Sequence, residues 1–473
     1  MVFSSIIFLF CFLPAFLLLY YLVGKKYKNP LILVASILFY VWGAPRFIFV
    51  ILGTTVADFF LVKKMDATGS KNARRLLLLC SLSINLGLLF YFKYANFFVD
   101  NLNELFALFS IKPVRWVGLA LPIGISFYTF ETITYVVDVY RRVHKPLRNF
   151  WDYQLYIILF PKLIAGPIIR YHDFAEQIYD HVHHETLEHR LRGFYRFVIG
   201  LGKKVMIANV LGSSAMHIAG MGSELDTVTA WIGAVCYAFQ IYFDFSGYSD
   251  MAIGLGMMMG FRFPENFNNP YTSLSVTDFW RRWHITLGSW MRNYLYIPLG
   301  GNRVNSKARL LFNLWLVFAL SGLWHGAAWG FIIWGLYHGF FLVIERFFLL
   351  NWLQRLGKAS VIYTFLVVVV GWVFFRAEHW APAIEYLGKM FSWHPSTGSW
   401  RIDTEVITIG ALAALFSFFT LMPVGLRIQQ KVFYSSLSAN GHRVMTWLMI
   451  ILLVLCAGRI TVSTFNPFIY FRF

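Results

Sequence analysis

The sequence predicts an all-helical, polytopic membrane protein. Of its 473 residues, 58% are hydrophobic and only 14% are charged, whereas soluble domains carry about 25% charged residues. The apolar residues form long runs separated by short polar loops, and no long polar stretch is available for a second, soluble domain. At roughly 20 residues for each crossing, a chain of this length holds about 11 to 13 membrane helices. We therefore expect one membrane domain over 1–473, with N-terminal helices in 1–150, a core containing re-entrant segments in 151–350 and C-terminal helices in 351–473.

The net charge of +18 is better explained by membrane topology than by nucleic-acid binding, because of where the basic residues lie. These residues sit in short loops between apolar runs, such as 24–29, 63–75 and 141–148. Loops rich in lysine and arginine stay on the cytoplasmic side of a membrane, and their charges attract anionic lipid. We therefore expect membrane lipid, and no nucleic acid, as a partner.

The N-terminal runs are expected to cross the membrane alternately. Run 3–23 lacks the basic start of a signal peptide, so we expect it to be a retained first span. Run 31–62 would be about 48 Å long as one helix, against about 30 Å of hydrocarbon, so a turn is expected at the Gly-Ala-Pro of 43–45. Runs 76–92 and 117–139 then leave and return, which places the N-terminus outside.

The middle of the chain is less regular. Run 152–167 contains Pro161, Gly166 and Pro167, which do not suit a plain span and predict a broken or re-entrant segment. Residues 170–192 are typical of a polar helix on the membrane surface, and 262–309 is the most polar long stretch of the chain. Further membrane helices are expected at 194–212, 228–260, 310–323, 327–350, 359–375, 405–424 and 444–461.

Two histidines stand beside apolar runs in the second half of the chain, His284 and His325. An ionisable side chain at membrane depth is costly, so each histidine is a functional-site hypothesis. Two of them around one membrane stretch indicate a reaction or a proton path inside the bilayer.

Residues 277–297 fit one amphipathic helix, with His284 at the edge of its apolar face. The apolar face would carry Trp280, Trp283, Leu287, Trp290, Met291 and Tyr294. The arginines Arg281, Arg282 and Arg292 point elsewhere and could bind the phosphates of a lipid or of a nucleotide-bearing donor. The alternative is a surface helix whose histidine only bonds a carbonyl group.

His325 follows Trp324 and lies between Gly322 and Gly326, which allow backbone or a ligand to approach closely. Desolvation at such a place disfavours the charged imidazole, and a neutral imidazole suits a general base. The alternative is a buried histidine that ties two helices together through a hydrogen bond.

The remaining polar positions are weaker candidates. Asp244 interrupts an apolar run and Asn266 follows that run, so either could contact substrate; the alternative is a membrane helix packed through serine and glycine. We expect His338 to serve packing. The histidines of 181–189 are expected on a solvated face rather than in a metal site, and we expect no metal. Neither a serine-nucleophile motif nor a P-loop is present in the sequence.

Several segments together resemble the membrane-bound O-acyltransferase family. That family pairs a histidine or asparagine with a downstream intramembrane histidine, which matches 280–287 (WRRWHITL) followed by 321–326 (SGLWHG). Four further segments resemble the bacterial, alginate-type branch: 122–130 (PIGISFYTF), 160–170 (FPKLIAGPIIR), 296–303 (YIPLGGNR) and 466–473 (NPFIYFRF). The resemblance runs from the first helix to the last residue.

The resemblance implies a fold and an activity. The family forms a ring of helices around a thinned centre, with a funnel on each side. It implies an O-acyltransferase of the bacterial inner membrane that passes an acetyl group from a cytosolic thioester, acetyl-CoA, toward an extracytoplasmic polysaccharide such as alginate. By the resemblance, His325 is the catalytic histidine and His284 its partner. The thioester is a substrate, and no cofactor is implied.

Other residues and partners follow from the same resemblance. The acceptor would be a serine of an extracytoplasmic partner of the SGNH-hydrolase type, or the polysaccharide itself. The candidate residues for binding donor or substrate are Trp283, Arg281, Arg282, Trp324, Asp244, Asn266 and Arg303.

Three other functions stay open on the sequence alone. D-alanyl transfer to teichoic acid occurs in the same family. A proton-coupled transporter would also use membrane histidines, although no internal repeat is visible. A scaffold subunit for polysaccharide export would not depend on either histidine.

Overall fold

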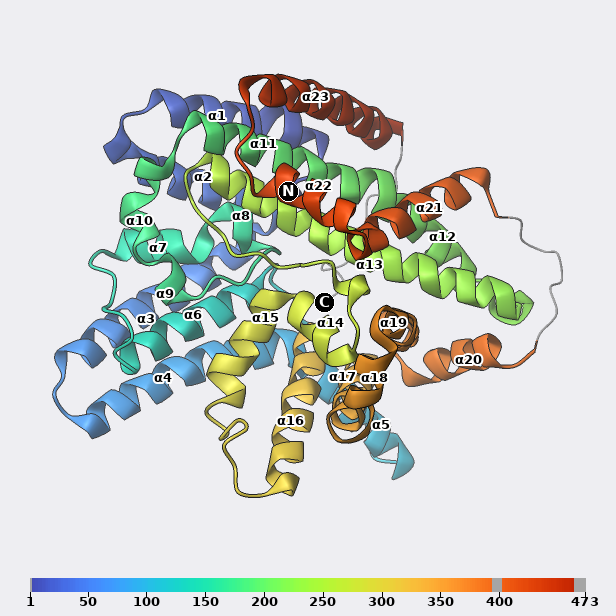
Figure 1. Ribbon diagram of the computed structural model, residues 1–473. Coiled ribbons are helices and arrows are strands. Elements are labelled where there is room, and N and C mark those ends of the chain that lie inside the picture. Colours follow the sequence, from blue (N-terminus) through green and yellow to red (C-terminus); the bar gives the residue numbers. More distant parts are fainter. Residues whose placement is uncertain (1, 394–401, 463–473) are drawn as a thin grey trace. The chain divides into compact units, whose positions relative to one another are not determined.

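The computed structural model describes residues 2–393 and 402–462, and within these ranges every regular element is a helix (Figure 1). This confirms the expected all-helical class. The described residues form two compact units. Within the described ranges, unit 1 comprises 2–186 and Met259–Phe263, and unit 2 comprises Leu187–Met258, 264–393 and 402–462. The family-like segment 466–473 lies outside the described residues.

Unit 1 follows the expected order of runs. Its α-helices are α1 (Leu13–Leu22), α2 (Lys28–Gly43), α3 (Ile48–Ala67), α4 (Lys71–Leu89), α5 (Ala95–Leu108), α6 (Ile125–Tyr140), α7 (Phe150–Ile158), α8 (Phe160–Leu163), α9 (Tyr171–Phe174) and α10 (Gln177–Asp180). The predicted turn in 31–62 is confirmed, because α2 ends at Gly43 and α3 begins at Ile48. The predicted break in 152–167 is also confirmed, since α7 ends at Ile158 and the short α8 follows it.

Two predictions for unit 1 were wrong in detail. The run 117–139 is helical only from Ile125, because Gly124 adopts a left-handed conformation (φ 77°) and no helix covers 111–122. Residues 170–192 do not form one surface helix. They form α9, α10 and a 3₁₀ turn at His181–His184, and the next long helix begins only at Leu187.

Unit 2 contains the longer helices. They are α11 (Leu187–Gly202), α12 (Asn209–Ala219), α13 (Thr227–Met258), α14 (Val276–Arg282), α15 (Ile285–Trp290), α16 (Lys307–His325), α17 (Trp329–Ile344), α18 (Leu350–Leu356), α19 (Ser360–Arg376), α20 (Trp380–Phe391), α21 (Thr404–Phe418), α22 (Pro423–Phe433) and α23 (Ala439–Val462). A π-helical turn, Lys203–Ala208, joins α11 to α12.

Helices α11 and α13 pack backbone against backbone through glycines. A Cβ atom on Gly193 would lie 2.6 Å from the carbonyl oxygen of Gly254, and one on Gly200 would lie 2.5 Å from that of Gly247. Small residues spaced along a helix allow this close approach in membranes, where burial of apolar surface cannot drive association. The glycines therefore fix α13 as the central helix from which unit 2 is built.

Eight helical stretches within the described ranges are long and apolar enough to cross a membrane. They are Pro45–Ala67, Lys71–Leu108, Leu187–Ala219, Thr227–Met258, Lys307–His325, Trp329–Arg376, Thr404–Leu421 and Ala439–Val462. The stretch Trp329–Arg376 contains both α17 and α19, which pack against each other, so the chain reverses within it. The chain is thus a multi-pass membrane protein.

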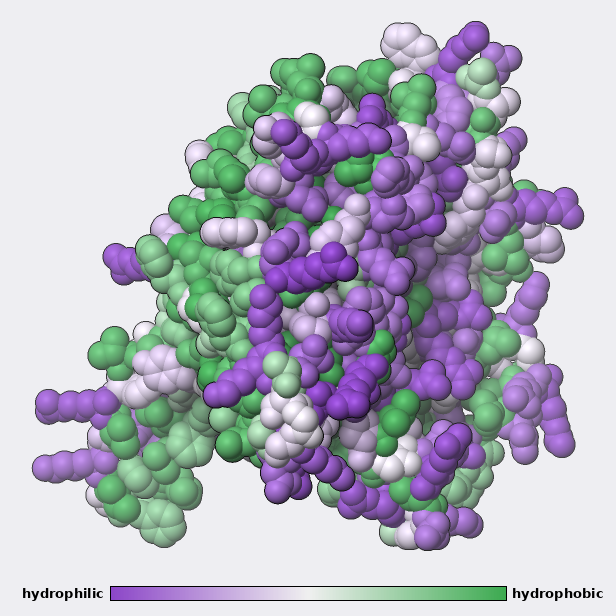
Figure 2. Space-filling model, turned by 90° about the vertical axis from the view of Figure 1, so that its left-hand side faces the viewer, coloured by the Kyte–Doolittle hydropathy of each residue, from purple (hydrophilic) through white to green (hydrophobic). Residues whose placement is uncertain are grey.

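Exposed apolar side chains fit contact with lipid. Phe49 and Phe60 on α3 are 75% and 64% exposed, and Leu76 on α4 is 63% exposed. Figure 2 shows apolar side chains gathered in broad areas of the face in view, beside stretches of hydrophilic side chains. A surface facing water would not carry so many large apolar groups.

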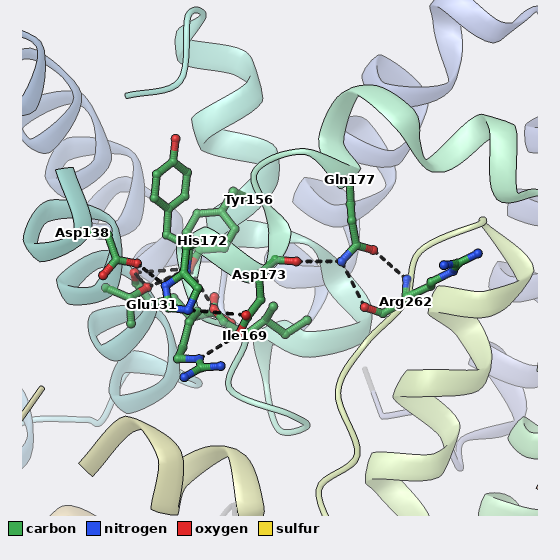
Figure 3. A network of polar contacts seen from close by, with 11 residues as sticks. Glu131, Asp138, Tyr156, Ile169, His172, Asp173, Gln177 and Arg262 are labelled. Atoms are coloured by element: carbon green, nitrogen blue, oxygen red, sulfur yellow. Dashed lines mark hydrogen bonds and ion pairs between the residues drawn. The ribbon is translucent and has the colours of Figure 1, made fainter. Parts of the chain in front are cut away.

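Unit 1 contains a buried ion pair. Lys162 on α8 is fully buried and forms an ion pair with Glu131 on α6. Beside it, the Tyr156 hydroxyl donates to the carbonyl of Ile169 at 2.8 Å (Figure 3). This buried pair ties the broken segment of α7 and α8 to helix α6.

The same network continues toward the last segment of unit 1 (Figure 3). His172 Nδ1 lies 2.7 Å from Asp138 Oδ2. Gln177 Nε2 donates to the carbonyls of Asp173 at 2.9 Å and of Arg262 at 3.1 Å. The Arg262 N–H returns a hydrogen bond to Gln177 Oε1 at 2.7 Å. These bonds explain why Met259–Phe263 belongs to unit 1.

Candidate functional site

The helix expected over 277–297 is broken at His284. Helix α14 ends at Arg282 and α15 begins at Ile285, and His284 between them has the left-handed φ of 45°. The extended segment before α14 satisfies the backbone groups freed by the break. Ile285 N–H donates to the Asn266 carbonyl at 2.9 Å, and Asn268 N–H donates to the Arg282 carbonyl at 2.9 Å. The prediction of one continuous helix was wrong because it could not include these partners.

The break turns the His284 ring into the interior of unit 2, where only 1% of the residue is exposed. Its Nδ1 atom lies 3.0 Å from Asn266 Oδ1. Its Nε2 atom is buried and has no hydrogen-bond partner among the described residues. His284 lies outside the eight candidate spans, and burial lowers its pKa to about 3, so the imidazole is neutral at physiological pH.

His325 is the last residue of α16 and is 3% exposed. Its ring centroid lies 5.1 Å from that of Trp334 on α17 and 5.2 Å from that of Phe375 on α19. The centroids of His284 and His325 are 6.4 Å apart. Unit 2 therefore brings the two candidate histidines together in a water-poor aromatic environment.

The glycines around His325 serve packing. A Cβ atom on Gly322 would collide with the carbonyl group of Phe331, and one on Gly326 would collide with the Phe331 ring. The space that these glycines leave is filled by α17. These glycines were expected to allow the close approach either of backbone or of a ligand. The structure shows that they allow the close approach of α17.

A cavity of about 470 Å³ lies beside His284 within unit 2. Three arginines from separate segments line it: Arg281 at the end of α14, Arg292 after α15, and Arg346 after α17. Trp280 and Ser321 contribute to the same wall. The cavity thus joins a buried imidazole to a strongly basic surface, which is a suitable arrangement for an anionic ligand.

The two candidate tryptophans take different places. The Trp324 ring centroid lies 5.0 Å from that of His325 and 6.0 Å from that of His284, so it contacts both histidines. Trp283 is buried among aromatic rings, with centroid distances of 4.8 Å to Trp372 and 5.0 Å to Phe267.

Three other candidates lie away from the basic cavity. Asp244 is buried and forms an ion pair with Lys204 at 2.7 Å, which joins α13 to the turn before α12. Arg282 is paired with Asp278 at 3.0 Å within α14. Arg303 is exposed and does not line the cavity.

Sequence reasoning missed the cavity role of Arg346. Arg292 was considered with Arg281 and Arg282 as a possible phosphate-binding residue, and it lines the cavity with Arg281. Arg346 is distant in sequence and enters through the packing of α16 on α17. In the sequence, Arg346 was marked only by its position near the end of an apolar run.

A second cavity of about 500 Å³ in unit 2 has Asn266 in its wall. Its polar end holds Asp250, which bonds Arg196 at 2.9 Å and Lys203 at 2.6 Å, and Arg196 also pairs with Glu265. These charges satisfy one another. Asn266 is therefore shared between this cavity and His284.

The predictions for His338 and His181 can be compared with the structure, and the prediction for His181 was wrong. His338 is fully buried between Trp280 and Trp334, at centroid distances of 5.0 and 5.3 Å, which fits a packing role. His181 is not on a solvated face: it is buried and contacts the Met259 carbonyl and Asn29. Across residues 2–393 and 402–462, no three His, Cys, Asp or Glu side chains are placed to hold a metal ion.

The described residues form a multi-pass, all-helical membrane protein with two buried histidines side by side, and comparison with known proteins shows the class of enzyme to which it belongs. Residues 103–377 match the membrane-bound O-acyltransferase family. The chain is 44% identical to the "Probable alginate O-acetylase AlgI" of Pseudomonas putida over 100% of both chains. It is 36% identical to the "Peptidoglycan O-acetyltransferase" of Helicobacter pylori, over 82% of this chain and 80% of that protein. It is 29% identical to the "Teichoic acid D-alanyltransferase" of Bacillus subtilis, over 48% of this chain and 59% of that protein.

The chain therefore belongs to the membrane-bound O-acyltransferase family and is an O-acyltransferase. This confirms the resemblance drawn from the histidine segments, and it sets aside the transporter and scaffold alternatives.

Proposed function

We propose that the chain passes an acetyl group from a cytosolic thioester, acetyl-CoA, across the membrane for O-acetylation of an extracytoplasmic polysaccharide such as alginate. The full-length similarity to a probable alginate O-acetylase supports the substrate class. The observation that carries the chemistry is the buried pair of His284 and His325, with ring centroids 6.4 Å apart beside a basic cavity.

In the proposed reaction, His325 acts as general base. Its imidazole takes the proton of the acceptor hydroxyl while the hydroxyl oxygen attacks the thioester carbonyl. The carbon–sulfur bond then breaks, the acetyl group stays on the oxygen, and the proton held by His325 passes to the thiolate, which leaves as free CoA while the imidazole returns to its neutral form. A positioned general base contributes typically about 10²–10⁴ in rate.

The basic cavity is the proposed place of the donor. Coenzyme A carries phosphate groups, and arginine binds phosphate through paired N–H donors. Arg281, Arg292 and Arg346 line the cavity whose wall also contains His284, so a donor anchored there would extend its thioester toward the histidine pair.

The orientation and partners follow from this placement. We propose that the basic loops face the cytosol, that the N-terminus lies outside, and that the chain sits in a bacterial inner membrane with its helices around a thinned centre. The eight candidate stretches of the described ranges, one of which contains both α17 and α19, account for part of the about 11 to 13 crossings expected from the sequence. The acceptor is a serine on an extracytoplasmic partner of the SGNH-hydrolase type, which then acetylates the polysaccharide. Direct transfer to the polysaccharide is the alternative outcome.

D-alanyl transfer to teichoic acid is the competing function within the family. The D-alanyltransferase similarity covers about half of this chain, whereas the alginate-type similarity covers all of it. The extent of the match favours acetyl transfer.

The test measures release of free CoA from labelled acetyl-CoA by the purified protein in detergent, together with the extracytoplasmic partner. Wild type should release CoA and transfer label, and His325→Ala should do neither at equal protein level. The exposed His379→Ala is the matched control and should behave as wild type. Transfer from a D-alanyl thioester, but not from acetyl-CoA, would reject the acetyl donor. Full activity of His325→Ala would remove His325 from the mechanism.

A further inference from the structure

We propose that Asn266 is a positioning residue that fixes the His284 ring with Nε2 as a hydrogen-bond acceptor in the acyl-transfer site. The inference rests on the proposed catalytic role of His284. Asn266 precedes α14 and is 1% exposed, and its side chain contacts His284 at the break and Thr286 just after it.

The hydrogen bonds of Asn266 determine which of its terminal atoms faces His284. The Thr286 backbone N–H lies 3.4 Å from Asn266 Oδ1, and the Thr286 hydroxyl lies 2.9 Å from the same atom. A backbone N–H can only donate, so the atom that it meets is the amide oxygen. On the opposite side, Asn266 Nδ2 donates to the Ser249 hydroxyl at 3.0 Å. Both ends of the amide are thus held in one orientation.

The amide oxygen then determines the position of the proton on His284. Asn266 Oδ1 carries no proton, so His284 Nδ1, which lies 3.0 Å away, must be the donor. A neutral imidazole has one N–H, so Nε2 holds a lone pair. Nε2 has no partner among the described residues, and His284 lines the basic cavity. Nε2 is therefore the ring atom left to accept a hydrogen bond or a proton from a bound group.

Asn266 also fixes the backbone at the same place. His284 has a left-handed φ of 45°, a conformation that surrounding structure must maintain in a residue other than glycine. The Asn266 carbonyl accepts the N–H of Ile285 at 2.9 Å, directly after this residue. One asparagine thus holds both the ring and the backbone of His284.

A histidine beside the thioester could either protonate the leaving thiolate or accept a hydrogen bond or a proton from a bound group, and this arrangement distinguishes the two roles. In the tautomer that Asn266 imposes, Nε2 has no proton to give to a leaving thiolate. His284 acts as an acceptor that orients a donor group, or receives a proton, before it can deliver one.

The experiment reads the tautomer and the kinetics of the full-length protein separately. Solid-state ¹⁵N NMR of histidine-labelled protein distinguishes a proton on Nδ1 from one on Nε2, and the His284 signals are those missing from His284→Gln. Wild type should carry the proton on Nδ1, and Asn266→Ala should lose that preference.

In acetyl transfer, Asn266→Ala should lower kcat about 10–100-fold, while KM for acetyl-CoA changes less than about twofold. Asn266→Asp, which keeps an acceptor oxygen, should recover most of kcat.

Asn268→Ala is the matched control, because the Asn268 side chain is exposed and bonds Asn269, while the backbone N–H that bonds the Arg282 carbonyl is kept in alanine. It should leave tautomer and kcat unchanged. A wild-type proton on Nε2, or an unchanged tautomer and kcat in Asn266→Ala, would overturn the inference even where His284→Gln is inactive. Wild-type activity of His284→Gln would instead overturn the proposed catalytic role of His284, and the role of Asn266 with it.

Discussion

The ion pair of Lys162 in unit 1 and the site around His284 in unit 2 use buried ionisable side chains in different ways. In unit 1, the buried Lys162 is bonded to Glu131, and the buried Asp58 is bonded to Ser81 and Asn85. In unit 2, buried His284 keeps one ring nitrogen without a partner among the described residues, at the wall of a cavity.

This difference separates structural from chemical use of polarity in an apolar protein. A buried charge is costly unless it is paired, so a fully paired group contributes to the fold and has no capacity left for a substrate. A neutral imidazole with an open nitrogen can be buried at lower cost and still accept a proton. Pairing, rather than burial, is therefore the criterion by which we rank the candidates.

The largest expected effect is on the rate of acetyl transfer and concerns the two histidines of unit 2. His325→Ala and His284→Gln should each lower kcat by about 10²–10⁴. If the two rings act as one unit, the double variant should lose little more than the more severe single variant. Acetyl transfer by the four proteins, with CoA release as the readout, measures this. Multiplied losses in the double variant would show that the histidines act independently.

The next effect is on stability and concerns the ion pair of unit 1. Glu131→Leu leaves the Lys162 ammonium buried without its carboxylate, which should cost about 3–5 kcal/mol of folding free energy. Glu131→Leu combined with Lys162→Met removes both charges and should restore most of the loss. Thermal unfolding in detergent measures both variants. A single variant as stable as wild type would contradict the structural role of the pair.

The sequence predicted much of the fold because helix length and breaks follow from local composition. The turn after Gly43 and the break around Pro161 were foreseen, since Gly and Pro act within a few residues of themselves. The break at His284 was not foreseen. No proline marks it, and it depends on hydrogen bonds from Asn266 and Asn268, which lie well before it in the chain.

The site was foreseen in part for the same reason. An ionisable residue in an apolar run is visible in sequence, so His284 and His325 were singled out. Partners formed by packing are not visible: Asp244 is paired with Lys204, and Arg346 enters the cavity through α17. Asn266 was expected to contact substrate; its contact with His284 is a further role that the sequence did not indicate.

A smaller effect distinguishes two adjacent arginines of α14. Arg281 lines the basic cavity, whereas Arg282 is paired with Asp278. A charge-assisted hydrogen bond contributes about 1.5–3 kcal/mol, so Arg281→Ala should raise KM for acetyl-CoA at least about tenfold. Arg282→Ala should have a smaller effect. Steady-state kinetics with varied acetyl-CoA, at low and high salt, compare them. A larger KM effect for Arg282→Ala would reverse the assignment.

The smallest expected effect is a pH dependence that does not come from His284. Its pKa is lowered by burial to about 3, against an ordinary value of 6.5, so lowering the pH from 8 to 5 does not protonate the folded enzyme at this ring. Any loss of activity as the pH falls through that range must come from the titration of another group. The residual activity of His284→Gln should therefore follow the same pH profile as wild type. A loss of activity near pH 6 that is present in wild type and absent from the variant would show that His284 titrates in the folded enzyme. The neutral acceptor that distinguishes the His284 site from the Lys162–Glu131 ion pair would then be lost.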